Sequence, residues 1–158
     1  MEPHLVLREA TVADEALLLR WRNDVDVRRE FFSDNEVSPA EHSRWFASKL
    51  ADREVTRILV AEIDGRPVGQ ARIDRARALV GEISVVVDTD FRGRGLGTEL
   101  IAKATELAAS ELGLERVEAH IKASNQASRH AFERAGYGDE RAEIHDGEPC
   151  LVLEWTIG

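Results

Sequence analysis

The fold is decided by residues 85–98, which read VVVDTDFRGRGLGT. Three β-branched valines predict the end of a buried strand, and an amphipathic helix begins directly after the turn that follows them. Glycines let the backbone approach a ligand closely, and unpaired N–H groups at a helix start attract anions. We therefore expect a pyrophosphate at this turn. The glycines and basic residues that favour it are Gly93, Gly95, Gly97, Arg92 and Arg94.

Two common phosphate-binding motifs do not fit this turn. The P-loop requires a Gly-Lys-Ser/Thr triplet, and the dinucleotide motif requires the spacing Gly-x-Gly-x-x-Gly; neither is present here. The residues alone therefore leave a second interpretation open, in which the segment is a tight strand-to-helix turn with solvated arginines.

Strands and helices follow one another on both sides of the turn. The helix after it spans Leu96–Leu112, with apolar residues at helical spacing, and Gly113 ends it. Other helices are expected from Thr11, from Ser38 (the start of a capping box) and over Ala127–Arg134. The expected strands, two pairs of which flank Asp-Gly turns, are His4–Glu9, Arg57–Ile63, Pro67–Ile73, Gly81–Val87, Arg116–Ala123, Arg141–His145 and Cys150–Ile157.

This order of elements contains a central strand–helix–strand crossover among grouped strands. It is typical of an α/β protein whose sheet has strands of mixed direction. No internal repeat, low-complexity tract or long linker interrupts the pattern, so residues 1–158 are interpreted as a single domain.

The composition excludes several classes of protein. The 158 residues, 43% of them hydrophobic, are enough to form one hydrophobic core. The net charge of −9 argues against nucleic-acid and anionic-membrane partners. No apolar run reaches the length of a membrane span, and Met1–Arg8 lacks the apolar stretch of a signal peptide, so we expect a cytoplasmic protein. The single cysteine, Cys150, lies in an apolar run, which favours a small core residue over a nucleophile.

The glycine-rich turn resembles the signature of the GNAT superfamily of acetyltransferases, Arg/Gln-x-x-Gly-x-Gly/Ala, although Thr89 stands where proline is usual. The resemblance implies a GNAT-like α/β fold: a mixed, mostly antiparallel central sheet flanked by helices, with a splayed strand pair that holds the coenzyme. It implies acetyl-CoA as acyl donor and no metal. It also implies that backbone amides hold the pyrophosphate and that one strand pairs with the pantetheine arm. The residues concerned are Arg92, Gly93, Arg94, Gly95, Leu96, Gly97 and Thr98 for the pyrophosphate, and Val85, Val86 and Val87 for the arm.

A second part of that signature lies downstream. The segment ASNQAS (residues 123–128), with Phe132 and Gly136-Tyr137 after it, is similar to the family's run of asparagine, small residues, tyrosine and Gly-Phe. The resemblance implies that Asn125 and Ser128 contact the coenzyme; a simple helix cap is the alternative for Asn125. Phe132 departs from the family, whose tyrosine here protonates the leaving thiolate. The general acid is therefore unassigned, with water, Ser128 and His130 as the alternatives.

Glu82 and Ser84 are the candidate catalytic residues. Acetylation of an amine requires the ammonium group to lose a proton first. Glu82 lies near the start of the strand that leads to the turn, and Ser84 follows it at period two. The GNAT family often places a glutamate on this strand as a base that acts through water, and Ser84 would help to hold that water. A structural pairing of Glu82 with an arginine is the alternative.

The N-terminal half carries a narrower resemblance, to the UDP-amino-sugar N-acetyltransferases of pseudaminic-acid-type pathways. The matching stretches are Trp-Arg-Asn at residues 21–23 and His-x-x-Trp at residues 42–45. The resemblance implies a small-molecule amine acceptor, a nucleotide-linked amino sugar, bound by Arg22, Asn23 and His42. Helix capping, solvated charge and a buried histidine explain these residues equally well.

Other functions also fit the sequence. Acetylation of protein N-termini or of ribosomal proteins is one, and a noncatalytic acyl-CoA-binding domain is another, because the usual tyrosine is missing. The expected oligomeric state is a monomer or a homodimer.

Overall fold

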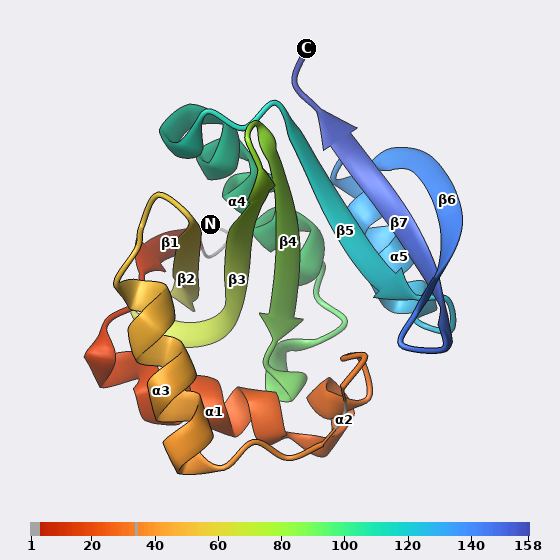
Figure 1. The fold of residues 1–158 in the computed structure, drawn as a ribbon. Helices are drawn as coiled ribbons and strands as arrows, with labels where there is room; N and C mark the ends of the chain where they lie inside the picture. Colours follow the sequence, from red (N-terminus) through yellow and green to blue (C-terminus); the bar gives the residue numbers. More distant parts are fainter. Residues whose placement is uncertain (1–3, 34) are drawn as a thin grey trace.

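A computed structural model of the chain describes residues 4–33 and 35–158. This part of the chain forms a seven-stranded sheet in the order β1-β2-β3-β4-β5-β7-β6 (Figure 1). All neighbouring strands are antiparallel except β4 and β5, which are parallel, and this confirms the mixed, mostly antiparallel α/β fold expected from the sequence. The strands are β1 (Leu5–Glu9), β2 (Thr56–Ile63), β3 (Arg66–Arg77), β4 (Val80–Val87), β5 (Arg116–Lys122), β6 (Gly138–His145) and β7 (Glu148–Thr156).

Helices cover both faces of the sheet. Figure 1 shows α4 and α5 behind the sheet and α3 in front of it. The larger core cluster joins the sheet to α4, through residues such as Leu100 and Ile73, and a second cluster joins the other face to α1 and α3, through Trp21 and Phe46. The helices are α1 (Glu15–Asn23), α2 (Val25–Arg28), α3 (Pro39–Leu50), α4 (Leu96–Leu112) and α5 (Gln126–Arg134), with short 3-10 turns at Val12–Asp14 and Thr89–Phe91.

Most element boundaries follow from local sequence signals. The bounds of α4 agree with the prediction to the residue, and Ser38 Oγ accepts a hydrogen bond from the Glu41 amide as the predicted cap of α3 requires. Three differences are larger than two residues. The four-residue helix α2 was not predicted, and β6 begins at Gly138, three residues before its predicted start. Strand β3 continues to Arg77, four residues past the predicted end, because Asp74 pairs with both β2 and β4 and the residues after it pair with β4.

The strands β4 and β5 separate after a short region of pairing. They pair only at Val80–Arg116, Gly81–Val117 and Glu82–Glu118, while β4 continues to Val87 and β5 to Lys122. Within the described chain, the two strands therefore diverge in the middle of the sheet, as the predicted splayed pair requires. In Figure 1 the opening lies between the lower ends of β4 and β5.

Candidate active site

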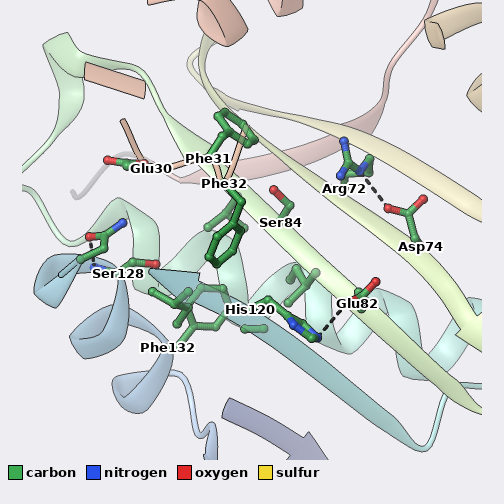
Figure 2. Close-up of a pocket in the computed structure, with 15 residues that line it drawn as sticks. Glu30, Phe31, Phe32, Arg72, Asp74, Glu82, Ser84, His120, Ser128 and Phe132 are labelled. Atoms are coloured by element: carbon green, nitrogen blue, oxygen red, sulfur yellow. Dashed lines mark hydrogen bonds and ion pairs between the residues drawn. The ribbon is translucent and has the colours of Figure 1, made fainter. Parts of the chain in front are cut away.

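The candidate active site is the gap that opens between β4 and β5. A cavity of about 190 Å³ lies there, shown in Figure 2. Glu82, Ser84 and Val85 line it from β4, and the α5 start supplies Asn125 and Ser128. Asn125 also caps α5, because its side-chain oxygen accepts a hydrogen bond from the Ser128 amide. The structure thus brings together five residues that were predicted for catalysis or coenzyme binding.

The turn from β4 to α4 has the backbone shape of an anion cradle. Gly93 and Gly95 have φ angles of 79° and 75°, a left-handed conformation that residues with side chains rarely adopt. A Cβ at either position would meet no atom within 4 Å, so the turn is open to a ligand. The residues Leu96–Thr98 form the first turn of α4, where a helix leaves N–H groups unpaired. These features fit a pyrophosphate group.

The two predicted arginines of the turn have separate surroundings. Arg92 Nη1 lies 2.8 Å from Glu30 Oε1, and Arg92 Nε donates to the carbonyl oxygen of Val87. The Arg94 guanidinium lies 5.3 Å from the centre of the Phe91 ring, and Arg66 approaches the same ring at 4.9 Å. Arg66 was not predicted, because only the folded β2–β3 hairpin brings it to the turn.

Glu30 is an unexpected acidic residue beside the cradle. It follows α2, lines the gap and pairs with Arg92, while burial raises its pKa despite that partner. A carboxylate so close to a phosphate site opposes the binding of an anion and competes for the arginine.

Replacing Glu30 with glutamine is therefore expected to tighten coenzyme A binding, by roughly threefold to tenfold at low ionic strength. The substitution releases Arg92 for the pyrophosphate and removes the repelling charge. Calorimetric titration with coenzyme A at two salt concentrations measures the effect. Glu36→Gln is the matched control, because Glu36 is an exposed carboxylate of the same connection that pairs with Arg28 at 3.9 Å. Weaker binding by Glu30→Gln would instead mean that Glu30 holds Arg92 in its binding position.

Glu82 has a histidine as its partner rather than the arginine considered from sequence. His120 Nε2, on β5, lies 2.8 Å from Glu82 Oε1, and both side chains line the gap (Figure 2). The contact lowers the pKa of Glu82, against the opposing effect of burial, and raises the pKa of His120. Near neutral pH the pair therefore combines an ionised carboxylate with an imidazole that holds a proton more tightly than usual.

The structure narrows the alternatives for a general acid. Phe132 lines the gap and packs edge-on against Tyr137. Tyr137 itself is buried, its hydroxyl lies 2.7 Å from Thr105 Oγ1 beneath α4, and burial raises its pKa. His130 is exposed and does not line the cavity, whereas Ser128 does. Of the residues considered from sequence, Ser128 is thus the one with access to the gap.

A second cavity, of about 380 Å³, lies on the face of the sheet that α1 and α3 cover. Arg22 and His42, both predicted as acceptor-binding residues, line it. Arg72 and Phe31 line both this cavity and the gap, so the two spaces adjoin. A cavity therefore lies beside the candidate catalytic residues, on the side where the sequence predicts the acceptor.

Asn23 lies elsewhere. Its side-chain amide donates to the carbonyl of Val37 and accepts from the amide of the same residue, both at 2.8 Å. It lines neither cavity. The observed contacts give Asn23 the structural role of joining the end of α1 to the segment before α3, and we leave it out of the acceptor site proposed below.

Three further observations concern the part of the chain that the structure describes. Cys150 is buried, and burial raises the pKa of its thiol, as expected of a core residue. Among residues 4–33 and 35–158, no group of three or more His, Cys, Asp and Glu side chains has the arrangement of a metal site. No helix in those same ranges has the length and apolar character needed to cross a membrane.

Comparison with known proteins places this geometry in a family. The family described as acetyltransferase (GNAT) domain matches residues 4–138. An L-methionine sulfoximine/L-methionine sulfone acetyltransferase of Pseudomonas aeruginosa is 33% identical over 138 residues, which are 83% of this chain and 78% of that protein. An uncharacterized N-acetyltransferase of Methanocaldococcus jannaschii is 35% identical over 112 residues, 66% of this chain; the match spans 48%, about half, of that protein.

The fold has close counterparts among solved structures. A spermidine N-acetyltransferase from Vibrio cholerae, solved with CoA and spermine, superposes with a TM-score of 0.88 at 17% identity, over 96% of this chain and 95% of the other. At that identity the similarity concerns the fold alone. With the family match over most of its length, the chain belongs to the GNAT acetyltransferases, and it carries an acetyl-CoA-dependent N-acetyltransferase domain.

Proposed function

We propose that the protein acetylates the α-amino group of a small amino acid. The observation that carries this proposal is a ladder of side chains on the acceptor face of β3 and β4. Asp74 lies opposite Glu82, Arg72 opposite Ser84, and Gln70 opposite Val86. Residues directly opposite in an antiparallel pair point to the same face, so these pairs form three successive rungs.

The first two rungs line the gap, and the third lines the second cavity. The rungs offer the carboxylates of Asp74 and Glu82, which can bind an ammonium group, and the guanidinium of Arg72, which can bind a carboxylate. In Figure 2, Arg72 and Asp74 lie side by side across from Glu82 and Ser84. Arg72 Nε donates to Asp74 at 2.8 Å, and Arg72, Thr56 and Lys49 outweigh burial and lower the pKa of Asp74. A zwitterionic amino acid matches this alternation of charge.

The spacing also favours a small acceptor. Successive rungs are roughly 7 Å apart, because a strand rises about 3.4 Å per residue. Arg72, one rung from Glu82, lines both spaces, so an amine held at Glu82 lies roughly 7 Å from the nearest rung of the second cavity, which is within the length of an amino-acid side chain. The Pseudomonas relative, whose named substrates are amino-acid derivatives, supports the same class.

Separate groups of residues bind the coenzyme, accept the proton of the amine and contact the leaving thiolate. Bound acetyl-CoA supplies a thioester whose acyl carbon a neutral amine attacks. Amides of the cradle, with Arg92 and Arg94, hold the pyrophosphate, and the unpaired edge of β4 at Val85–Val87 orients the pantetheine arm. The Glu82–His120 pair accepts the proton of the ammonium group, directly or through a water that Ser84 holds. The Ser128 hydroxyl hydrogen-bonds the thiolate as it leaves.

A nucleotide-linked amino sugar is the second candidate acceptor. Arg22 and His42, two of the three residues implied by the narrower sequence resemblance, do line the second cavity, and this favours it. Peptide N-termini are the third class to test.

We expect L-amino acids to be acetylated with a kcat/KM at least about tenfold above that for a UDP-linked amino sugar, a tripeptide or spermidine. Release of coenzyme A, followed with a thiol reagent, measures the rates, and mass spectrometry of the product identifies the acetylated amine. A higher kcat/KM for the amino-sugar nucleotide would contradict the proposed amino-acid acceptor. It would leave the assignment as an acetyltransferase unchanged.

A further inference from the structure

The second cavity has aromatic walls and a polar lining. Trp21, Phe31 and Trp45 contribute the apolar surface, and Leu18 and Val86 extend it. Its polar residues come from both layers: Arg22, Glu41 and His42 from the helices, and Gln70 and Arg72 from β3. A cavity with large apolar surface and a few placed polar groups is suited to one small ligand or to part of one.

His42 is the most unusual of these polar residues. It is only 4% exposed, and its ring stacks on Phe46 with 5.8 Å between ring centres. Its Nδ1 is buried and has no hydrogen-bond partner within residues 4–33 and 35–158. Buried polar atoms are rarely left unpaired, so such an atom in a cavity wall calls for a ligand or a water molecule.

The surroundings of His42 favour an uncharged ligand group. Burial lowers the pKa of His42, so the ring is neutral near pH 7 and offers a hydrogen bond rather than a charge. The arginines of the cavity already have partners. Arg22 lies over the Phe31 ring at 4.4 Å and donates to the Ser33 carbonyl. Arg72 pairs with Asp74 and lies over the Trp45 ring at 5.2 Å, and it is assigned above to the carboxylate of the acceptor. Glu41, the remaining charged residue of the lining, is exposed, so an ion pair with it would be weak.

An anionic side chain would lose its hydration here without gaining an ion pair of its own, and a cationic one would gain only a weak pair with the exposed Glu41. A purely apolar side chain would fill the aromatic part but leave the His42 nitrogen unpaired. Both losses are avoided by a group that is apolar along its length and ends in a neutral hydrogen-bonding group.

We infer that the second cavity binds the side chain of the acceptor, and that His42 selects an uncharged side chain with a hydrogen-bonding end. This inference rests on the proposed function, because it assumes that an amino acid enters with its amine at Glu82. The distance from the Glu82 rung to the Arg72 rung, which lines both spaces, is roughly 7 Å and corresponds to a side chain of about four or five bonds. Sulfone and carboxamide side chains have this length and chemistry.

The test compares acceptors of equal length in the parent enzyme and in His42→Phe. L-Methionine sulfone and L-norleucine have the same chain length and differ in the polar sulfone, and L-glutamine and L-glutamate differ in charge. We expect kcat/KM to be about tenfold higher for methionine sulfone than for norleucine, and higher for glutamine than for glutamate. In His42→Phe the sulfone preference, measured as the ratio of kcat/KM for methionine sulfone to that for norleucine, should fall to below about twofold.

A second variant, His42→Gln, keeps a neutral hydrogen-bonding group and should restore part of the sulfone preference. Calorimetric binding of coenzyme A and thermal unfolding show whether each variant is folded. An unchanged sulfone preference in His42→Phe, or a parent enzyme that prefers norleucine or glutamate, would overturn the subsite. Acetylation of another amine with no turnover of any amino acid would overturn the proposed function, and the subsite with it.

Discussion

Substitution of Gly95 by valine is expected to weaken acetyl-CoA binding by more than about tenfold. Gly95 immediately precedes α4 and has a φ of 75°. A β-branched residue disfavours that conformation by roughly 1–2 kcal/mol, so the turn must rearrange and the first-turn amides of α4 move with it. Titration calorimetry with acetyl-CoA gives the dissociation constant of each variant.

The matched control is Gly113→Val at the other end of the same helix. Gly113 has a φ of 65°, and a Cβ there would also meet no atom within 4 Å, so the backbone strain is of the same kind. This variant should lose stability but keep the parent's affinity for acetyl-CoA. If Gly95→Val bound acetyl-CoA as tightly as Gly113→Val does, the pyrophosphate would have to lie away from this turn.

Replacing Glu82 with glutamine is expected to lower kcat by about 100-fold and to move the acid limb of the pH–rate profile downward. Glu82 raises the pKa of His120, so removal of the carboxylate returns the imidazole toward its ordinary value of 6.5. The parent should thus lose activity as the pH falls through an apparent pKa above 6.5, and the variant should lose it at lower pH. Rates at saturating concentrations of both substrates, measured between pH 5.5 and 9, test this.

Glu148→Gln is a suitable control for that experiment. Glu148 is a half-exposed carboxylate on β7 that lies 3.6 Å from Lys122 Nζ, and it does not line the gap. It should leave kcat and the pH profile near those of the parent. A Glu82→Gln variant whose acid limb coincides with the parent's would exclude the Glu82–His120 pair as the proton acceptor, whatever the loss in rate.

The parts of the fold that were predictable are those with local signals. The boundaries of α4 follow from an apolar stripe that begins after one glycine and ends at another. Hairpin turns at Asp64-Gly65 and Asp146-Gly147 carry the positive φ angles that such pairs favour. The end of β3 was not predictable in this way, because it depends on pairing with other strands: Asp74 pairs with β2 and β4, and the residues after it pair with β4.

The residues of the candidate site likewise fall into those with a sequence signal and those without one. Glu82 and Ser84 could be selected because the resemblance to the GNAT family implies a base on the strand that leads to the glycine turn, and Ser84 follows Glu82 at period two. His120 and Glu30 could not, since each reaches the site from a different segment, and only the divergence of β4 and β5 shows that His120 lies at the gap. Asn23 was predicted from a motif, but its contact with Val37, fourteen residues away, has no sequence signal.

The divergence of β4 from β5 also has a thermodynamic consequence. It leaves peptide groups in the middle of a sheet without a neighbouring strand, and water must solvate them in the free protein. In the proposed complex the pantetheine arm replaces that water and pairs with the free edge of β4. The coenzyme therefore binds the folded chain and not the unfolded one. A ligand at 100 times its dissociation constant then adds about 2.7 kcal/mol to the free energy of unfolding. The supply of acetyl-CoA would thus raise the equilibrium stability of the folded enzyme as well as its rate of turnover.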